Sequence, residues 1–208
     1  MIKILIKICL VGAMSVRKST TADRLNTVLK FNGIKSGVCE DYARDYIMKF
    51  GKPVFPWEQY AILLGQKEKE ELLMKSDYDI IICDSSVVLN FVYANYMAKQ
   101  FGQSIATFWE ASGLQNLDKK LNKLKKDLYE ETIRYVSSYD KTYYMPPTKK
   151  EVVHDGVRFG DEEAQDEIDR MVVGFLNSEG IPYVTVQGDT VDEKANAILR
   201  DLGFKYHC

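Results

Sequence analysis

The stretch MIKILIKICLVGAMSVRKST, residues 1–20, decides the fold class of this chain. Residues 2–11 are a nearly unbroken apolar run rich in β-branched side chains, which predicts a central strand covered on both faces. Gly12 ends the run, and an amphipathic helix is expected over residues 18–30, with Ala22 and Leu25 on its apolar face. A buried strand that enters a helix through a short turn is a junction suited to binding an anion.

The rest of the chain repeats this alternation of strand and helix. Helices are expected over residues 41–50, 57–75, 86–101, 116–136, 161–177 and 191–202, with an irregular segment over residues 102–113. Further strands are expected at residues 34–39, 78–83, 142–145 and 181–186. The pattern predicts an α/β fold with a parallel sheet and helices on both faces. With 208 residues, and without a linker or repeat, residues 1–208 are expected to form a single domain.

Charge and cysteine usage exclude several classes of function. The net charge of −2 gives no reason to expect nucleic acid or a membrane surface as partner. The apolar start is too short to span a bilayer and lacks a small-residue cleavage site. No CxxC pair is present, so Cys9, Cys39 and Cys83 are interpreted as buried apolar residues rather than zinc ligands. A cytoplasmic location is expected, and the oligomeric state is left open.

The turn GAMSVRKST, residues 12–20, has the spacing of a P-loop, the motif that wraps nucleotide phosphates. Backbone N–H groups and the positive end of the helix dipole hold the anion, Lys18 reaches the phosphates, and Ser19 coordinates Mg²⁺. ATP and Mg²⁺ are therefore the expected ligands, and the alternative is a strand–turn–helix junction without a ligand. The nucleotide-binding residues expected here are Gly12, Ala13, Met14, Ser15, Val16, Arg17, Lys18, Ser19 and Thr20.

Arg17 departs from the P-loop pattern, which has glycine before the lysine. Glycine permits close approach of the backbone to phosphate and a dihedral that other residues resist. Three interpretations of Arg17 are open: a variant that points to solvent, an added charge at the phosphate site, or a lesion that weakens ATP binding.

Two expected strands end in carboxylates. Asp84 follows the strand YDIIIC, where P-loop enzymes hold Mg²⁺, and the alternative is a helix N-cap shared with Ser85 or Ser86. Glu40 ends the second strand, faces the same crevice, and could accept a proton from an attacking hydroxyl. The alternative for Glu40 is a solvated helix start. Arg44 lies one helical turn further on, where it could bind substrate phosphate or pair with Glu40.

A polar loop follows the fourth expected strand. Its sequence HDGVRFGDEE, residues 154–163, flanks Arg158 with glycines, which is typical of a mobile lid over residues 146–162. An arginine that closes over the γ-phosphate favours phosphoryl transfer. The alternative is a surface turn with one solvated arginine.

These motifs together resemble those of the nucleoside and nucleotide kinases of the P-loop superfamily. The chain is most similar to ribosylnicotinamide-kinase-type ATPase domains, including phage-encoded relatives, and the likeness covers nearly the whole chain in order. The motifs that carry the resemblance are GAMSVRKST at residues 12–20, EDYAR at 40–44, PWEQ at 56–59, the strand ending in Asp84, and DGVR at 155–158.

The resemblance implies a P-loop NTPase three-layer sandwich whose five-stranded parallel sheet has the order 2-3-1-4-5, with a lid. It also implies ATP as phosphate donor and Mg²⁺ as cofactor. Glu40 or Asp84 would then lie near the acceptor hydroxyl, Arg158 in the lid, and Gly188 and Asp189 near the adenine.

The expected function is an ATP-dependent phosphotransferase that moves the γ-phosphate to a hydroxyl or phosphate of a nucleoside, nucleotide or nucleotide-like acceptor. A kinase acting on DNA, at a modified base or a strand end, is one alternative; the overall charge opposes it. A non-catalytic nucleotide-binding regulatory module, which Arg17 would suit, is the other. A basic helix would serve the DNA kinase, and its lysines are Lys119, Lys120, Lys123, Lys125 and Lys126.

Overall fold

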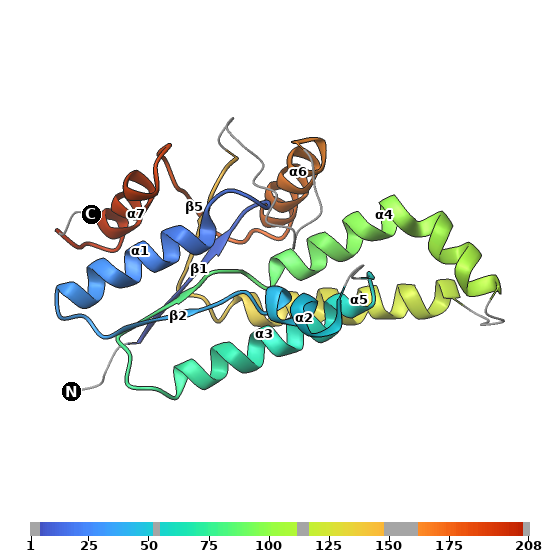
Figure 1. Ribbon diagram of the computed structural model, residues 1–208, viewed down its shortest axis with the longest axis horizontal. Helices are drawn as coiled ribbons and strands as arrows, with labels where there is room; N and C mark the ends of the chain where they lie inside the picture. Colours follow the sequence, from blue (N-terminus) through green and yellow to red (C-terminus); the bar gives the residue numbers. More distant parts are fainter. Residues whose placement is uncertain (1–4, 52–54, 112–116, 148–161, 206–208) are drawn as a thin grey trace.

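The computed structural model describes residues 5–51, 55–111, 117–147 and 162–205 (Figure 1). Its strands are β1 (Ile6–Val11), β2 (Ser36–Cys39), β3 (Ile80–Cys83), β4 (Lys141–Tyr144) and β5 (Val184–Thr185). Its helices are α1 (Lys18–Phe31), α2 (Tyr42–Phe50), α3 (Glu58–Met74), α4 (Val88–Ala111), α5 (Leu117–Val136), α6 (Glu162–Ser178) and α7 (Val191–Asp201).

The five strands form one parallel sheet in the order β2-β3-β1-β4-β5, which confirms the order that the family resemblance implied. In the central register Cys83 of β3 lies beside Cys9 of β1 and Cys39 of β2. Because all strands run the same way, the turns that follow β1, β2 and β3 meet at one edge of the sheet. Gly12, Glu40 and Asp84 all lie at this edge.

Helices cover both faces of the sheet, as the alternating pattern predicts. The step from β1 to β2 crosses the sheet in one direction, and the later steps to β3, β4 and β5 run in the other. Right-handed crossovers therefore put α1 on one face and the helices from α2 to α6 on the opposite face. The last helix, α7, packs beside α1, which completes three layers (Figure 1).

The core lies in the two central strands. Residues 8–11 of β1 and 80–83 of β3 are at most 1% exposed, because helices cover both faces of these strands. The three thiols in this layer are buried, as expected, and desolvation raises the pKa of Cys9 to about 12. Cys9 therefore remains protonated, and the three buried thiols act as small apolar side chains.

Helix α4 differs from the sequence-based expectation. The prediction of an irregular segment over residues 102–113 is wrong as far as Ala111, because α4 continues through Gly102 to that residue. A helical glycine costs only about 1 kcal/mol, and α4 packs along both α5 and α6. Tertiary contacts therefore outweigh the local signal. Among the described residues no helix is long and apolar enough to cross a membrane.

Candidate functional site

The turn between β1 and α1 has an unusual backbone. Gly12 has a φ of 155°, and a Cβ atom there would lie 2.4 Å from the carbonyl oxygen of Met145. Ser15 and Arg17 adopt positive φ values of 62° and 68°. Glycine is therefore required at position 12, and two ordinary residues hold the left-handed conformation that the wrapped turn needs.

Side chains from three helices hold the carbonyl oxygens of this turn. In a trans peptide the N–H points away from the C=O, so each bound carbonyl fixes the direction of the amide that follows it. The shape of the turn is thus fixed both by the start of α1 and by the helices α6 and α7. The contacts are Lys18 Nζ to Gly12 O (2.9 Å) and Ala13 O (2.7 Å), Gln165 Nε2 to Met14 O (2.6 Å), and Lys194 Nζ to Val16 O (3.2 Å).

Lys18 begins α1 and is only 6% exposed. Its ammonium curls back to the first two carbonyls of the turn, at the position from which a P-loop lysine meets phosphate. Ser19, the expected Mg²⁺ ligand, follows it in the first turn of α1 and is half-buried.

Arg17 takes the place of the missing glycine by adopting its conformation. It is the N-cap of α1 at φ 68° and ψ 31°, and its side chain is exposed. The left-handed region costs a residue with a Cβ about 1–2 kcal/mol, which neighbouring contacts must offset. The backbone cradle is therefore formed despite the substitution, with Lys18 rather than Arg17 buried in the turn.

Asp84 lies at the end of β3 and is 4% exposed. Its N–H donates to the carbonyl of Cys39 at 2.9 Å, which ties the ends of β3 and β2 together. Ser86, which was expected to share the capping of the next helix, accepts the N–H of Val88 at its Oγ at 3.3 Å. The metal-binding interpretation of Asp84 stays a prediction.

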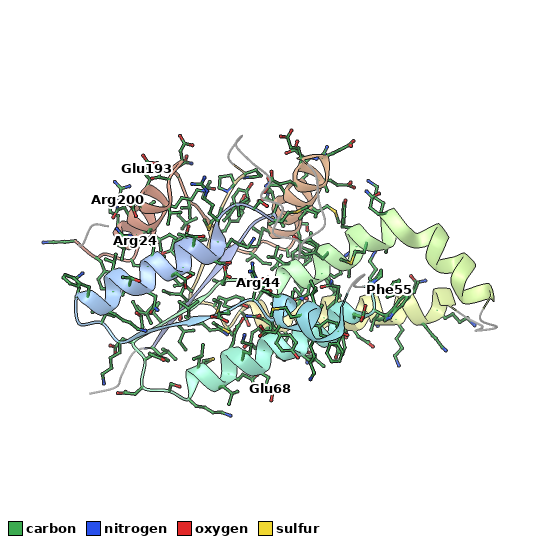
Figure 2. The ribbon with its side chains drawn as sticks, in the orientation of Figure 1. Arg24, Arg44, Phe55, Glu68, Glu193 and Arg200 are labelled. Atoms are coloured by element: carbon green, nitrogen blue, oxygen red, sulfur yellow. The ribbon has the colours of Figure 1, made fainter. Side chains whose placement is uncertain are left out.

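Glu40 is exposed and directly follows β2 at the carboxyl end of the strand. The neighbouring Asp41 caps α2 instead, because its Oδ1 accepts the N–H of Ala43 at 3.0 Å. Glu40 is therefore not needed to start the helix. Arg44 is exposed near the start of α2 (Figure 2).

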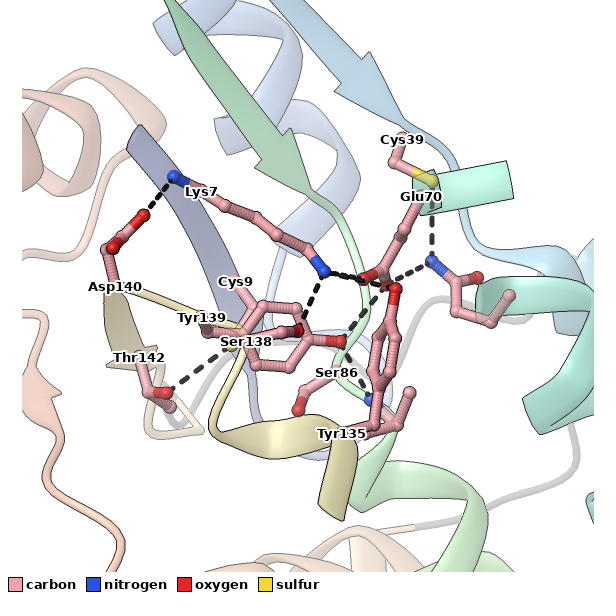
Figure 3. A network of polar contacts seen from close by, with 12 residues as sticks. Lys7, Cys9, Cys39, Glu70, Ser86, Tyr135, Ser138, Tyr139, Asp140 and Thr142 are labelled. Carbon is pink, nitrogen blue, oxygen red and sulfur yellow. Dashed lines mark hydrogen bonds and ion pairs between the residues drawn. The ribbon is translucent and has the colours of Figure 1, made fainter. Parts of the chain in front are cut away.

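The first turn of α2 rests on a buried polar network (Figure 3). Lys7 of β1 and Glu70 of α3 form an ion pair with Nζ–Oε2 of 2.8 Å, and both side chains are at most 2% exposed. Gln66 donates to Glu70 Oε1 at 3.0 Å and accepts the N–H of Tyr42 at 2.8 Å. The network therefore links the central strand to the helix that follows Glu40. Other members are Tyr135 and Ser138, which accept from Lys7, and Tyr139, which donates to Glu70.

Helix α6 contributes two residues that the sequence analysis missed. Gln165 binds the turn as described, and Asp169, one helical turn later, accepts the hydroxyl of Tyr144 at 2.7 Å. Burial raises the pKa of Asp169, while Tyr144 and the charge of Lys18 act in the opposite direction. Its second carboxylate oxygen is buried without a hydrogen bond to any described residue. The spacing of four residues on one helix face was the available signal.

The turn before α7 is well defined. Glu193 and Thr190 form a capping box, and Gly188 has a φ of 131°, where a Cβ would lie 2.6 Å from Cβ of Glu193. This turn borders an open depression of about 540 Å³, and Figure 2 shows Glu193 and Arg200 of its lining on α7. The adenine role of Gly188 and Asp189 stays a prediction. The lining residues are Gln187, Gly188, Asp189, Glu193, Asn196 and Arg200.

Two further expectations have separate outcomes. Arg158 and most of the lid, residues 148–161, lie outside the described residues. The five lysines of the basic helix are exposed, and Lys126 pairs with Glu130 at 3.7 Å.

The described residues contain no group of three His, Cys, Asp or Glu side chains that could hold a metal. A buried aspartate and a hydroxyl fit Mg²⁺, which usually takes few protein ligands beside phosphate and water.

The comparisons with known proteins agree with this geometry. A family model described as an AAA domain matches residues 7–194. No curated protein matches the chain. Two crystal structures of NadR are similar: one in complex with NAD and AMP-PNP (TM-score 0.70) and one in complex with NR (TM-score 0.68). Both are 16% identical, and each match covers 98% of this chain and 51% of the NadR chain. The chain thus spans about half the length of NadR.

A deoxyadenosine kinase from M. mycoides, with dCMP and dCDP bound, is also similar. The TM-score is 0.53 at 14% identity, and the match covers 95% of this chain and 99% of that one. At such identities the likeness concerns the fold. The fold is that of the P-loop nucleotide kinases, which confirms the resemblance identified from the motifs.

Proposed function

The chain belongs to the AAA domain family, and from this premise we propose that it is an ATP-dependent kinase. It moves the γ-phosphate of ATP to a hydroxyl or phosphate of a nucleoside, nucleotide or nucleotide-like acceptor. One observation carries the proposal: the turn over residues 12–17 wraps ahead of α1, with two of its carbonyls bound by the buried Lys18 and two by Gln165 of α6 and Lys194 of α7.

The donor side consists of the turn, Lys18, Ser19 and Asp84. The backbone amides and the start of α1 bind the phosphates, and Lys18 stabilises the charge that develops on them. Ser19 and Asp84 would hold Mg²⁺, which, when bound, neutralises phosphate charge. The burial of Asp84 beside β2 supports this assignment, because a buried carboxylate favours a cationic partner.

The acceptor side consists of Glu40 and Arg44. Glu40 follows β2, which is the neighbour of β3, so the acceptor hydroxyl would lie between Glu40 and the phosphate cradle. Glu40 would accept the proton of that hydroxyl, and Arg44 would bind a phosphate or polar group of the acceptor. Arg158 would close over the γ-phosphate from the lid, and Gly188 and Asp189 would border the adenine.

The similar structures support a small acceptor. One contains NadR with AMP-PNP, an ATP analogue, and another is of a deoxyadenosine kinase. The exposed lysines of α5 favour DNA as a second candidate acceptor. The acidic residues Asp127, Glu130 and Glu131 follow these lysines on α5, and Glu130 pairs with Lys126, which weakens a phosphate-binding surface.

Phosphate transfer from labelled ATP tests the proposal. The full chain is incubated with Mg²⁺ and with separate panels of nucleosides, nucleotides and oligonucleotides. Label on a small acceptor, lost in Lys18→Met and Asp84→Asn, is the expected result. Lys75→Met, at an exposed position after α3, is the control and should retain activity. Label only on DNA would show that the acceptor is DNA and not a small molecule. Binding of AMP-PNP without any transfer would favour a regulatory module.

A further inference from the structure

Lys194 of α7 is completely buried, and its ammonium donates to the carbonyl of Val16 at 3.2 Å. The two residues are 178 positions apart in the sequence. They meet because α7 packs beside α1, the helix that starts directly after the phosphate turn (Figure 1). The contact acts directly on the turn, because Val16 is one of its residues and immediately precedes Arg17, the N-cap of α1.

The bound carbonyl belongs to the peptide whose N–H is that of Arg17. A donor on the carbonyl fixes the plane of this peptide, and in a buried environment it also makes the N–H a stronger donor. Arg17 follows in the left-handed conformation at φ 68°, which a side chain with a Cβ adopts only when its surroundings hold it there. Lys194 therefore acts on the one peptide that the missing glycine leaves strained.

The charge of Lys194 also matters. Within the described residues no carboxylate oxygen comes within 4.0 Å of its ammonium. Burial and the neighbouring charge of Arg17 lower the pKa of Lys194, and Asp189 opposes them. A buried cation behind an anion-binding turn becomes more favourable when the anion is bound.

We propose that Lys194 is a positioning residue of the phosphate site: it holds the Val16–Arg17 peptide so that Arg17 can replace the usual glycine. It also supplies positive charge from behind the turn. The identity of the anion as a triphosphate rests on the proposed function, whereas the effect of Lys194 on the turn does not.

The first test measures the turn without ligand. In the full chain, Lys194→Met should speed amide hydrogen exchange in peptides covering residues 12–18, because the Val16–Arg17 peptide loses its anchor. Arg24→Met is the matched control: Arg24 also bridges α1 and α7, through Asp192 at 2.8 Å, but does not contact the turn. Equal exchange of residues 12–18 in the wild type and in Lys194→Met would overturn the proposal.

The second test is a double-mutant cycle on the affinity for AMP-PNP with Mg²⁺, measured by calorimetry. Lys194→Met should weaken binding about tenfold or more when Arg17 is present. In the Arg17→Gly background the same substitution should cause a loss of affinity about threefold smaller, because glycine needs no support in the left-handed conformation. Lys194→Arg keeps a donor and a charge and should rescue binding. Equal losses in both backgrounds would refute the compensating role. Failure of the wild type to bind AMP-PNP would refute the kinase assignment alone, because the exchange experiment still decides the role of Lys194.

Discussion

The side-chain oxygen of Gln66 accepts a hydrogen bond from the backbone N–H of Tyr42 at 2.8 Å, so α3 holds the first turn of α2. No residue of helix α2 is fully buried, and only one side of it, with Tyr42 and Tyr46, is half-buried, so apolar packing alone holds it weakly. Gln66 is 2% exposed and is itself bound to Glu70 of the network in Figure 3. The position of α2, and with it Arg44, therefore depends in part on the hydrogen bond from Tyr42 to Gln66.

Gln66→Leu should loosen α2. The substitution leaves the N–H of Tyr42 without its acceptor, and such a loss costs about 1–3 kcal/mol. We expect faster amide hydrogen exchange over residues 42–50 and a lower urea midpoint. Lys69→Ala is the control, since it removes a partly exposed ion pair with Asp45 between the same helices and should cost less than about 1 kcal/mol. Unchanged exchange in Gln66→Leu would contradict the prediction.

Gly65→Ala should destabilise the folded protein where Tyr42 of α2 lies against α3. A Cβ at Gly65 would lie 2.1 Å from Cε1 of Tyr42, so the ring must move, at a cost of about 1–3 kcal/mol. Gly174→Ala is the matched control, because a Cβ there meets no atom within 4 Å. It should stabilise the protein by about 0.5–1 kcal/mol through helix propensity. Urea unfolding of both variants checks the opposite signs, and stabilisation by Gly65→Ala would be inconsistent with the observed packing.

Removing one charge of the buried ion pair between Lys7 and Glu70 should destabilise the folded protein more than removing both charges. Glu70→Gln leaves the ammonium of Lys7 buried without a carboxylate, and such losses amount to about 3–5 kcal/mol. The double variant Lys7→Met with Glu70→Leu removes both charges and should unfold at a higher urea concentration than Glu70→Gln. If the double variant is the less stable of the two, the hydrogen bonds of the network outweigh the cost of desolvation.

Asp169→Asn should raise the melting temperature at neutral pH. Burial raises the pKa of Asp169 in the folded state, so the folded protein binds the proton more tightly than the unfolded chain. Stability is therefore lost as pH rises above the ordinary value of 3.8 and through the folded-state pKa. Asparagine cannot ionise and can still accept the hydroxyl of Tyr144.

Melting curves between pH 3 and pH 7 check this expectation. The advantage of Asp169→Asn should be largest at neutral pH and should disappear at low pH, where the wild-type carboxyl is protonated in both states. Asp166→Asn should give a smaller rise, because its charge also raises the pKa of Asp169. A lower melting temperature for Asp169→Asn at pH 7 would contradict the prediction.

Much of the fold was predictable from the sequence. The apolar run before Gly12, the acidic ends of the second and third strands, and the alternation of periodicities each depend on a few neighbouring residues. The error over residues 102–111 shows the limit of such reasoning. An irregular segment was expected from Gly102 onward, whereas contacts of α4 with α5 and α6 keep the chain helical to Ala111.

The sequence by itself determined that a strand, a wrapped turn and a helix follow one another at residues 6–31, because short-range patterns control those choices. Only the tertiary structure decided which distant side chains hold the turn in its wrapped conformation. Gln165 and Lys194 reach its carbonyls from positions 151 and 178 residues downstream of Met14 and Val16. These contacts follow from the order of strands and the handedness of crossovers, because α6 and α7 cover opposite faces of the sheet but both begin near the carboxyl ends of its strands.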